Sequence, residues 1–437
     1  MQGIALPPLE KRLKARYMTL VKSHMRSVSK LAAGVASLPS VASAFAATQG
    51  AWRFFNNERV GLPALIEPLR AMGRDGLAAD EAPFALLVHD WCKLSFSFAD
   101  SKRDLIQLTH ATDIGYELTT ALLVTAGDGR PLAPMEMHLK TADGVLSTRL
   151  RAPRNVHHLD QVLPTMKVAK TWGLPKPLVH VIDREADSVD HYRKWDAAGH
   201  RFLVRGDDRR VKWEGKVHLL STIRTALEGR AAFRLIRAVP YHDTTAQLWV
   251  AETSVILHRP AKKSVKGQKF ERPGRPLPLR YVAVQLRDIE GRVLAEWMLL
   301  SNVPAAWATA EKLAFCYYWR WRIESFFKLL KSHGQQLEQW QQETGPALAR
   351  RLLVAAMACV VVWHLQADDT PQATELKDIL IRLSGRQTKR KRPHTAPALL
   401  AGLWVLLSMR ALLEHCDLDR LEALVNRIPY LDVGNVV

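Results

Sequence analysis

The stretch Phe84-Ala85-Leu86-Leu87-Val88-His89-Asp90 decides the fold class. It is short and mostly apolar, which is typical of a buried strand, and it ends on a carboxylate. A second apolar run, Leu178 to Ile182, is followed by Asp183 in the same way. An aspartate after a strand is common in α/β proteins, so each one alone is weak evidence. The pair predicts an α/β fold with carboxylates at the ends of two central strands.

The segment between these two strands sets the order of the elements. Residues Tyr116 to Lys140 read as two strands around the turn Gly127-Asp128-Gly129, and a helix is expected from Asp160 to Trp172. Strand, strand, strand, helix, strand is the order of the ribonuclease-H-like fold, in which nucleases place metal carboxylates at strand ends. Short alternating segments between residues 207 and 300 predict a β-rich insertion. Beyond Ala308 the pattern returns to helices, interrupted by the basic linker Gly385 to Pro393.

The chain is strongly basic, with 62 Lys and Arg against 43 Asp and Glu and a formal charge of +19. This balance points to a polyanionic partner, and nucleic acid is favoured over an anionic membrane surface or a merely basic enzyme. Residues 1–56 contain one acid and eight bases, which indicates a small helical module that contacts DNA. A solvated basic helix is the alternative there. The basic loop from Arg259 to Arg275 leaves the same two options, phosphate contact or a solvated loop.

Cysteine usage and the apolar runs predict a cytoplasmic protein. The cysteines Cys92, Cys316, Cys359 and Cys416 form no C-x-x-C pair and no Cys/His grouping with zinc-site spacing, so they are interpreted as reduced structural thiols. Ser, Pro and Gly interrupt the small-residue stretch Leu31 to Ala47, which argues against a secretory signal. The run Leu352 to Trp363 is shorter than the roughly 20 residues that cross a bilayer, and we expect a buried core helix and no membrane contact.

The stretch from Tyr317 to Lys331, YYWRWRIESFFKLLK, carries a third carboxylate, Glu324. Placed on one helix at about 100° per residue, it separates into two faces. The polar face holds Tyr317, Arg320, Glu324, Lys328 and Lys331, and the apolar face holds Trp319, Ile323, Phe326, Phe327 and Leu330. One interpretation is a surface helix stabilised by ion pairs four residues apart. The other is a carboxylate that binds hard Mg²⁺ beside cations that hold phosphates.

Cleavage of a phosphodiester needs two metal ions about 3.5–4 Å apart, and ions that close require clustered carboxylates. Asp90, Asp183 and Glu324 can supply them, and we take these three residues as the candidate catalytic groups and metal ligands. The ordered trio is stronger evidence than any one of its members.

At these residues the sequence resembles the hairpin-forming cut-and-paste DDE transposases of bacterial insertion sequences, the IS-four family that includes the Tn-five type. The family's spacing of Tyr, two residues, Arg, three residues, Glu, six residues, Lys is matched by Tyr317, Arg320, Glu324 and Lys331. Asp183 to Asp187 is similar to the family's DREAD segment. The stretch Gln49 to Asn56 is similar to part of its amino-terminal DNA-binding module, so the resemblance covers nearly the whole chain.

The resemblance implies a reaction in four steps: nicking of one strand, hairpin formation, hairpin opening and strand transfer into target DNA. It implies two Mg²⁺ ions, replaceable by Mn²⁺, and a homodimer that binds double-stranded DNA with terminal inverted repeats in the bacterial cytoplasm, at the nucleoid. Trp297 lies where the family stacks a flipped base, although a plain core tryptophan is the alternative. The residues expected to contact DNA are Tyr317, Arg320, Arg322, Lys328, Lys331, Arg184, Trp297 and Arg53.

The predicted organisation has five parts. They are a helical DNA-binding module at 1–70, the first part of a ribonuclease-H-like core at 71–206, the β-rich insertion at 207–300, the second part of the core with the catalytic helix at 301–345, and a helical dimerisation region at 346–437. Cys92 and Lys93 depart from the small hydroxylated residues expected after the first aspartate, and the amino terminus looks shorter than the family's. The alternative function is therefore an inactive or truncated DNA-binding regulator. A carboxylate-pair hydrolase such as a glycosidase explains neither the charge nor the basic face around Glu324.

Overall fold

A computed structural model of the chain describes residues 4–26, 41–97, 101–151, 157–241, 244–258, 261–265, 268–272, 275–331, 334–386, 394–425 and 427. The helices are α1 (Lys11–Arg26), α2 (Val41–Phe55), α3 (Leu62–Ala78), α4 (His158–Ala169), α5 (Val189–Ala197), α6 (Leu220–Gly229), α7 (Ala310–Tyr318), α8 (Trp321–Leu330), α9 (Gly345–Ala367), α10 (Pro371–Leu383), α11 (Ala396–Leu413) and α12 (Leu418–Val425), with short 3-10 turns η2 (Arg184–Ala186) and η3 (Leu337–Gln339). The strands are β1 (Ala85–Ser95), β2 (Ile106–Gln107), β3 (Ile114–Thr125), β4 (Pro131–Thr141), β5 (Gly144–Ser147), β6 (Leu178–Ile182), β7 (Arg201–Arg205), β8 (Arg210–Trp213), β9 (Lys216–Leu219), β10 (Arg234–Tyr241), β11 (Thr244–Leu257), β12 (Ala261–Val265), β13 (Gln268–Arg272), β14 (Leu277–Arg287) and β15 (Val293–Ser301).

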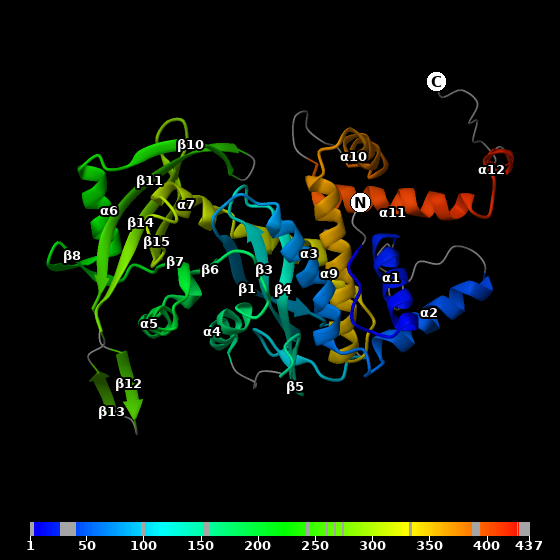
Figure 1. Cartoon of the computed structure of the whole chain (residues 1–437), viewed down its shortest axis with the longest axis horizontal. Helices are drawn as coiled ribbons and strands as arrows, with labels where there is room; N and C mark the ends of the chain where they lie inside the picture. The colour runs from blue at the N-terminus through cyan, green and yellow to red at the C-terminus, as the bar shows by residue number, and fades with distance from the viewer. Residues whose placement is uncertain are drawn as a thin grey trace.

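A mixed 13-stranded sheet runs through the molecule in the order β5-β4-β3-β1-β6-β7-β15-β14-β11-β8-β9 along its main path (Figure 1). The strands β1, β3 and β4 pair antiparallel, and β3 and β4 are joined by the short turn at Gly129. β6 and β7 then add in parallel to β1, after connections that contain the helices α4 and α5. The protein is therefore an α/β protein with a large sheet covered by helices.

The helical layer is organised around α9. Of its 23 residues, those from Leu352 to Val360 are all buried, and the helix packs against α1, α3, α8, α11 and β4. Figure 1 shows α9 upright between the sheet and the amino-terminal helices α1 and α2. The predicted core helix is confirmed, although it is longer than its apolar run. Among the described residues, two helices, α9 and α11, are long and apolar enough to cross a membrane. In α9, 89% of the apolar window is buried inside the protein, and in α11 33% is.

Several predicted elements agree with the structure. β6 covers Leu178 to Ile182, α4 covers most of the predicted helix, and β3 and β4 flank the predicted turn, where Gly129 adopts a φ of 72°. One strand end was wrong. β1 does not end at Asp90 but continues to Ser95, because its antiparallel partner β3 pairs with it along its whole length. Pairing with β6, in contrast, stops at His89 and Ile182, so Asp90 and Asp183 both follow the last paired residue.

The prediction of one helix from Tyr317 to Lys331 was also wrong. The chain forms α7 and α8, separated by a turn at Trp319 and Arg320 in which the hydrogen bonds tighten to a spacing of three residues. The ring of Trp319 lies against the backbone of Gly129, where an added Cβ would come within 2.3 Å of it. The residues of the predicted apolar face are nevertheless buried. The break between α7 and α8 therefore changes the direction of the helix without exposing the core.

The β-rich segment predicted as an insertion continues the main sheet. β15 pairs with β7, β14 with β15, and β11 with β14, all antiparallel. β12 and β13 pair with each other in a separate two-stranded sheet that projects at the lower left of Figure 1. The side chains of the predicted basic loop from Arg259 to 274 lie outside the described part of the chain, as do residues 387–393 of the basic linker and residues 31–40 of the small-residue stretch.

Candidate active site

The structure brings the three predicted carboxylates around one guanidinium, that of Arg320. Its Nη1 lies 3.1 Å from Oδ2 of Asp90, and its Nη2 lies 2.7 Å from Oε1 of Glu324 and 3.5 Å from Oδ2 of Asp183. These acids come from β1, from the residue after β6, and from α8. Residues far apart in the sequence therefore converge because β1 and β6 are neighbours in the sheet and α8 packs against β1.

Local backbone contacts orient both aspartates. Oδ1 of Asp90 accepts the amide N–H of Trp91 at 2.9 Å, and Oδ1 of Asp183 accepts that of Arg184 at 2.7 Å. The hydroxyl of Tyr317 also donates to Oδ1 of Asp183, at 2.9 Å. With Oδ1 held in this way, Oδ2 of each aspartate faces Arg320. The two carboxylates thus present one oxygen each to a common point.

The two aspartates differ in their tendency to ionise. Burial raises the pKa of Asp90 to about 6, against the opposing effects of Arg320 and the Trp91 amide, and the charges of Glu324 and Asp183 add to the rise. Burial also acts on Asp183, but Arg320, the Arg184 amide and the Tyr317 hydroxyl outweigh it and hold its pKa below the ordinary value. A carboxylate that ionises readily beside one that resists ionisation is typical of a functional site.

An open pocket of about 540 Å³ contains this cluster. Lys331 reaches its wall, where its Nζ lies 2.7 Å from the carbonyl oxygen of Lys93 and 2.9 Å from the carboxylate of Glu338. Glu338 in turn accepts the amide N–H of Ser95 at 2.9 Å. Lys328 is exposed at the same pocket. Two lysines therefore border the three acids, as the polar face of the sequence predicts.

The residues of the pocket fit divalent metal ions. Carboxylate oxygens are the ligands that hard cations such as Mg²⁺ prefer. The three acids share a single guanidinium, so the cluster retains excess negative charge that bound cations can balance. The position of Arg320 already marks where positive charge is stabilised. This set of oxygen donors therefore fits divalent metal ions.

A second pocket, of about 300 Å³, lies beside the first and shares Lys328 with it. Its walls are aromatic and include Trp297, Tyr318, Trp319 and Trp321. The ring of Trp297 is 5.5 Å from that of Tyr317, whose hydroxyl holds Asp183. Trp297 is largely buried, as expected for a tryptophan of the core, and it also lines this pocket. The pocket connects the predicted aromatic residue to the carboxylate cluster.

The other predicted DNA-contacting residues are placed less centrally. Arg322 lines the aromatic pocket and donates from Nε to the carbonyl oxygen of Gly129 at 2.8 Å. Arg184 is exposed and lies 3.4 Å from Asp207. Arg53 is exposed on α2, outside both pockets, and contacts Gln49. The structure thus brings Tyr317, Arg320, Lys328 and Lys331 to the carboxylates but leaves Arg53 on a separate surface.

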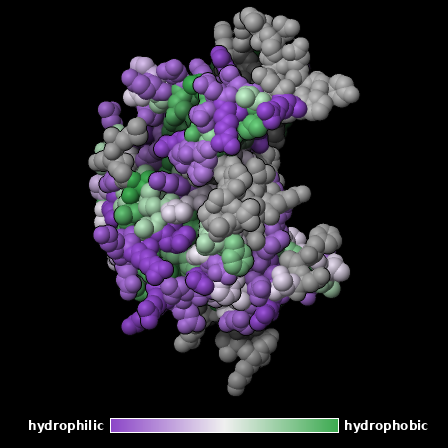
Figure 2. All heavy atoms as spheres, turned by 90° about the vertical axis from the view of Figure 1, so that its right-hand side faces the viewer, coloured by the Kyte–Doolittle hydropathy of each residue, from purple (hydrophilic) through white to green (hydrophobic). Residues whose placement is uncertain are grey.

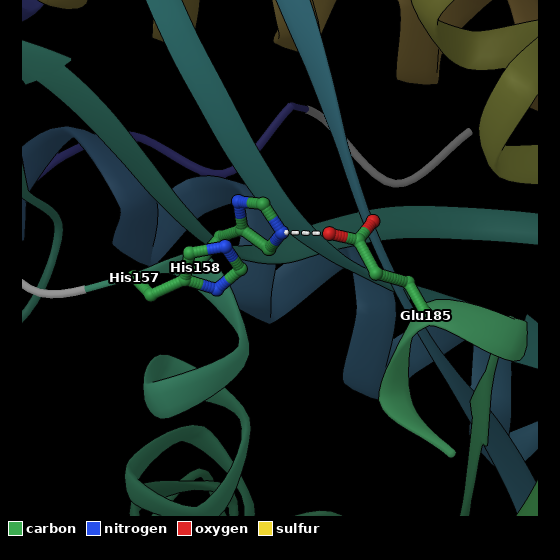
Figure 3. A group of neighbouring side chains, drawn as sticks. All are labelled: His157, His158 and Glu185. Carbon is green, nitrogen blue, oxygen red and sulfur yellow. Dashed lines mark hydrogen bonds and ion pairs between the residues drawn. The ribbon is translucent and has the colours of Figure 1, made fainter. Parts of the chain in front are cut away.

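The sequence interpretation missed several residues near the site. Glu338, on η3, has no motif that could reveal it. His157 and His158 converge on Glu185, the third residue of the DREAD-like segment (Figure 3). A pair of adjacent histidines at the start of a predicted helix was a visible signal, but its partner lies 27 positions away in sequence from His158. Only the sheet topology brings the three together.

Comparison with known proteins identifies the family of the chain. Residues 129–361, more than half of the 437-residue chain, match the family described as the transposase DDE domain. No curated protein matches the chain. Among solved structures, the piggyBac transposase in a synaptic complex with hairpin DNA is similar at 11% sequence identity over 98% of this chain and 78% of that one, with a TM-score of 0.37, which is too low to carry an argument. On the strength of the family match, the chain belongs to the DDE-domain transposases.

Proposed function

We propose that this transposase cuts DNA at the ends of an insertion sequence and moves the element by a cut-and-paste reaction. The observation that carries the proposal is the convergence of Asp90, Asp183 and Glu324 on Arg320. We assign the strands β1, β3, β4, β6 and β7, with their helices, as a ribonuclease-H-like core, because their order and directions match that fold. The three carboxylates then lie at the carboxyl side of its central strands.

The three carboxylates are the proposed ligands of two Mg²⁺ ions, for which Mn²⁺ substitutes; these ions activate the attacking oxygen and stabilise the leaving oxygen. Arg320 contacts all three acids, and bound cations would compete with it for these oxygens, so that its guanidinium would be available to donate to a phosphate. Lys328 and Lys331 border the same pocket and add positive charge for the DNA backbone. Tyr317 positions Asp183 through its hydroxyl.

The aromatic pocket supports the hairpin step. A hairpin forms when the 3′-hydroxyl freed by nicking attacks the opposite strand, which requires sharp bending of the DNA end. A base turned out of the stack can be held between aromatic side chains, at about 1–3 kcal/mol per stacked base. Trp297, Trp319 and Trp321 provide such surfaces next to the carboxylates. Arg322 and Arg184 are proposed to contact the backbone nearby, and Arg53 to contact DNA from α2.

We further propose that the protein acts as a homodimer in the bacterial cytoplasm, at the nucleoid. The buried helix α9 leaves little surface for such a contact, but α11 and α12 expose apolar side chains. These include Met409, Leu413, Leu418 and Leu424. Figure 2 looks onto the side of the molecule that carries these helices and shows hydrophobic patches among hydrophilic residues. Exposed apolar groups of this kind favour a protein contact over solvent.

The proposal is tested by incubating the protein with Mg²⁺ and a linear duplex that carries its element's own ends. Denaturing gels are expected to show nicked strands and then hairpins. Glu324→Gln is expected to keep end binding in a mobility-shift measurement but to lose cleavage by at least about a hundredfold. If the wild-type protein binds the ends without cutting them, it is a DNA-binding regulator instead. If Glu324→Gln cuts at the wild-type rate, the assignment of the third carboxylate is wrong.

A further inference from the structure

A cluster of His157, His158 and Glu185 lies beside the carboxylate pocket, and it offers one ligand atom from each residue within 4.8 Å of the others. Figure 3 shows the two imidazoles side by side at the start of α4, with the carboxylate of Glu185 facing them from η2. Nε2 of His158 lies 2.9 Å from Oε1 of Glu185, and the two imidazole centroids are 3.9 Å apart. One nitrogen of each histidine and one carboxylate oxygen are therefore close enough for one ion to reach all three.

The outer atoms of this cluster are fixed by further residues. Nδ1 of His158 lies 3.2 Å from the carboxylate of Glu117, on β3, which leaves Nε2 as the atom that faces Glu185. Oε2 of Glu185 accepts the indole N–H of Trp91 at 3.1 Å, which leaves Oε1 to face His158. The Trp91 ring also stacks on His158 at 3.9 Å. A carboxylate on the far nitrogen of a histidine is the arrangement that orients histidine ligands in metal sites.

We propose that His157, His158 and Glu185 bind one Zn²⁺ ion, or another divalent transition metal of similar preference, separately from the carboxylate cluster. Imidazole nitrogens suit Zn²⁺, whereas Mg²⁺ prefers oxygen ligands. With metal bonds of about 2.0–2.2 Å, the ligand atoms of a tetrahedral site are about 3.4 Å apart, so small side-chain shifts complete the site. Three protein ligands leave a fourth position for water, as in zinc sites that are open to solvent.

The residues of this site lie next to the two candidate aspartates in the sequence. Trp91 directly follows Asp90, and Glu185 is two residues after Asp183. An ion held there joins the start of α4 to η2 and, through Trp91 and Glu117, to β1 and β3. It therefore stiffens the backbone on which both aspartates depend. The inference stands on these contacts alone and does not require that the protein cleave DNA.

The test uses the full chain, stripped of metal with a chelator and titrated with ZnCl₂ in a calorimeter. His157 is exposed, so His157→Ala is expected to fold like the wild type, as circular dichroism can check. This variant is expected to lose one equivalent of Zn²⁺ or to bind it at least about tenfold more weakly. Glu117→Gln is expected to weaken binding by about tenfold without removing a ligand. Saturating Zn²⁺ is expected to raise the Tm of the wild type more than that of His157→Ala.

Two further variants separate this site from other places where Zn²⁺ could bind. His110→Ala removes an exposed histidine outside the cluster and is expected to bind Zn²⁺ like the wild type. Glu324→Gln disrupts the carboxylate cluster and is expected to bind the same one equivalent of Zn²⁺ as the wild type. If His157→Ala binds Zn²⁺ with wild-type affinity and stoichiometry, the inference is overturned. Loss of the equivalent in Glu324→Gln, with its retention in His157→Ala, would also overturn it.

Discussion

Arg320 donates to Asp90 over 3.1 Å, although the two residues are 230 positions apart in the sequence. The side chain of Arg320 is only 5% exposed, and its charge is balanced by acids on β1, α8 and the end of β6. These carboxylates and Tyr317 raise the pKa of Arg320 above its ordinary value despite the opposing effect of burial. This one side chain therefore contacts all three acids.

Replacing that cation tests its structural contribution. Arg320→Ala leaves three neighbouring acids without a counter-charge, and we expect the free energy of unfolding without metal to fall by about 3 kcal/mol. Added Mg²⁺ is expected to recover more stability in the variant than in the wild type, because the ions supply the missing charge. Urea unfolding with and without Mg²⁺ measures both effects. Arg184→Ala, which breaks only an exposed pair, is the control and is expected to change stability by less than about 1 kcal/mol.

The raised pKa of Asp90 predicts a pH dependence of stability. Its pKa is about 6 in the folded protein, against about 3.9 in an unfolded chain, so the folded state holds the proton more tightly. Without metal, stability is therefore expected to fall as the pH rises from about 4 to about 6, by about 1–3 kcal/mol from this group. Asp90→Asn is expected to remove this loss and to be more stable than the wild type at pH 7. Asp75→Asn, an exposed change on α3, is the matched control.

The aromatic pocket can be tested without emptying the core. Trp297→Ala would cost about 3–5 kcal/mol through a cavity, so Trp297→Phe is the better variant. We expect it to nick DNA at nearly the wild-type rate but to form hairpins about tenfold more slowly, because a smaller ring stacks less well on a turned-out base. Nicked and hairpin products on a denaturing gel separate the two steps. Trp249 lies outside the pocket, so Trp249→Phe is the control and is expected to leave the nicking and hairpin rates unchanged. Equal hairpin rates in the two variants would exclude the proposed role of Trp297.

Gly129 allows the turn that carries Arg320 to approach the sheet. Its φ is 72°, and a Cβ there would come within 2.3 Å of the Trp319 ring. Gly129→Ala is therefore expected to destabilise the protein by about 3 kcal/mol or more, since it adds a clash to the cost of the left-handed backbone. Gly291 has a similar φ of 84° with open space around it. Gly291→Ala is therefore expected to lower the free energy of unfolding only by the backbone cost, about 1–2 kcal/mol. Similar losses of stability in both variants would show that the contact with Trp319 contributes nothing.

The sequence predicted the parts of the fold that depend on local pattern. The apolar run before Asp183 predicted where β6 ends, and the turn at Gly129 predicted the boundary between β3 and β4. Helical spacing predicted the buried face of α8. The full length of β1 could not be predicted, because it depends on pairing with β3. The break at Trp319 escaped prediction for a similar reason: it depends on packing against Gly129, 190 positions earlier.

The candidate site shows the same division. Residue types and spacing were enough to propose Asp90, Asp183 and Glu324, and the structure places them together. Their mutual orientation depends on backbone amides and on the Tyr317 hydroxyl, which no spacing rule specifies. The cluster at His158 was missed because its members meet only when α4 folds against β1 and β3.

The pairing of β15 with β7 has a mechanical consequence. Leu299 and Leu300 of β15 are hydrogen-bonded neighbours of Arg205 and Val204 of β7, which in turn pairs with β6 just before Asp183. β15, which carries Trp297, and β6, which ends before Asp183, thus belong to one continuous hydrogen-bonded sheet, with β7 between them. Neither can slide relative to the other without breaking several backbone hydrogen bonds. In the proposed reaction, the DNA is therefore repositioned between steps, while Trp297 and Asp183 keep a constant separation.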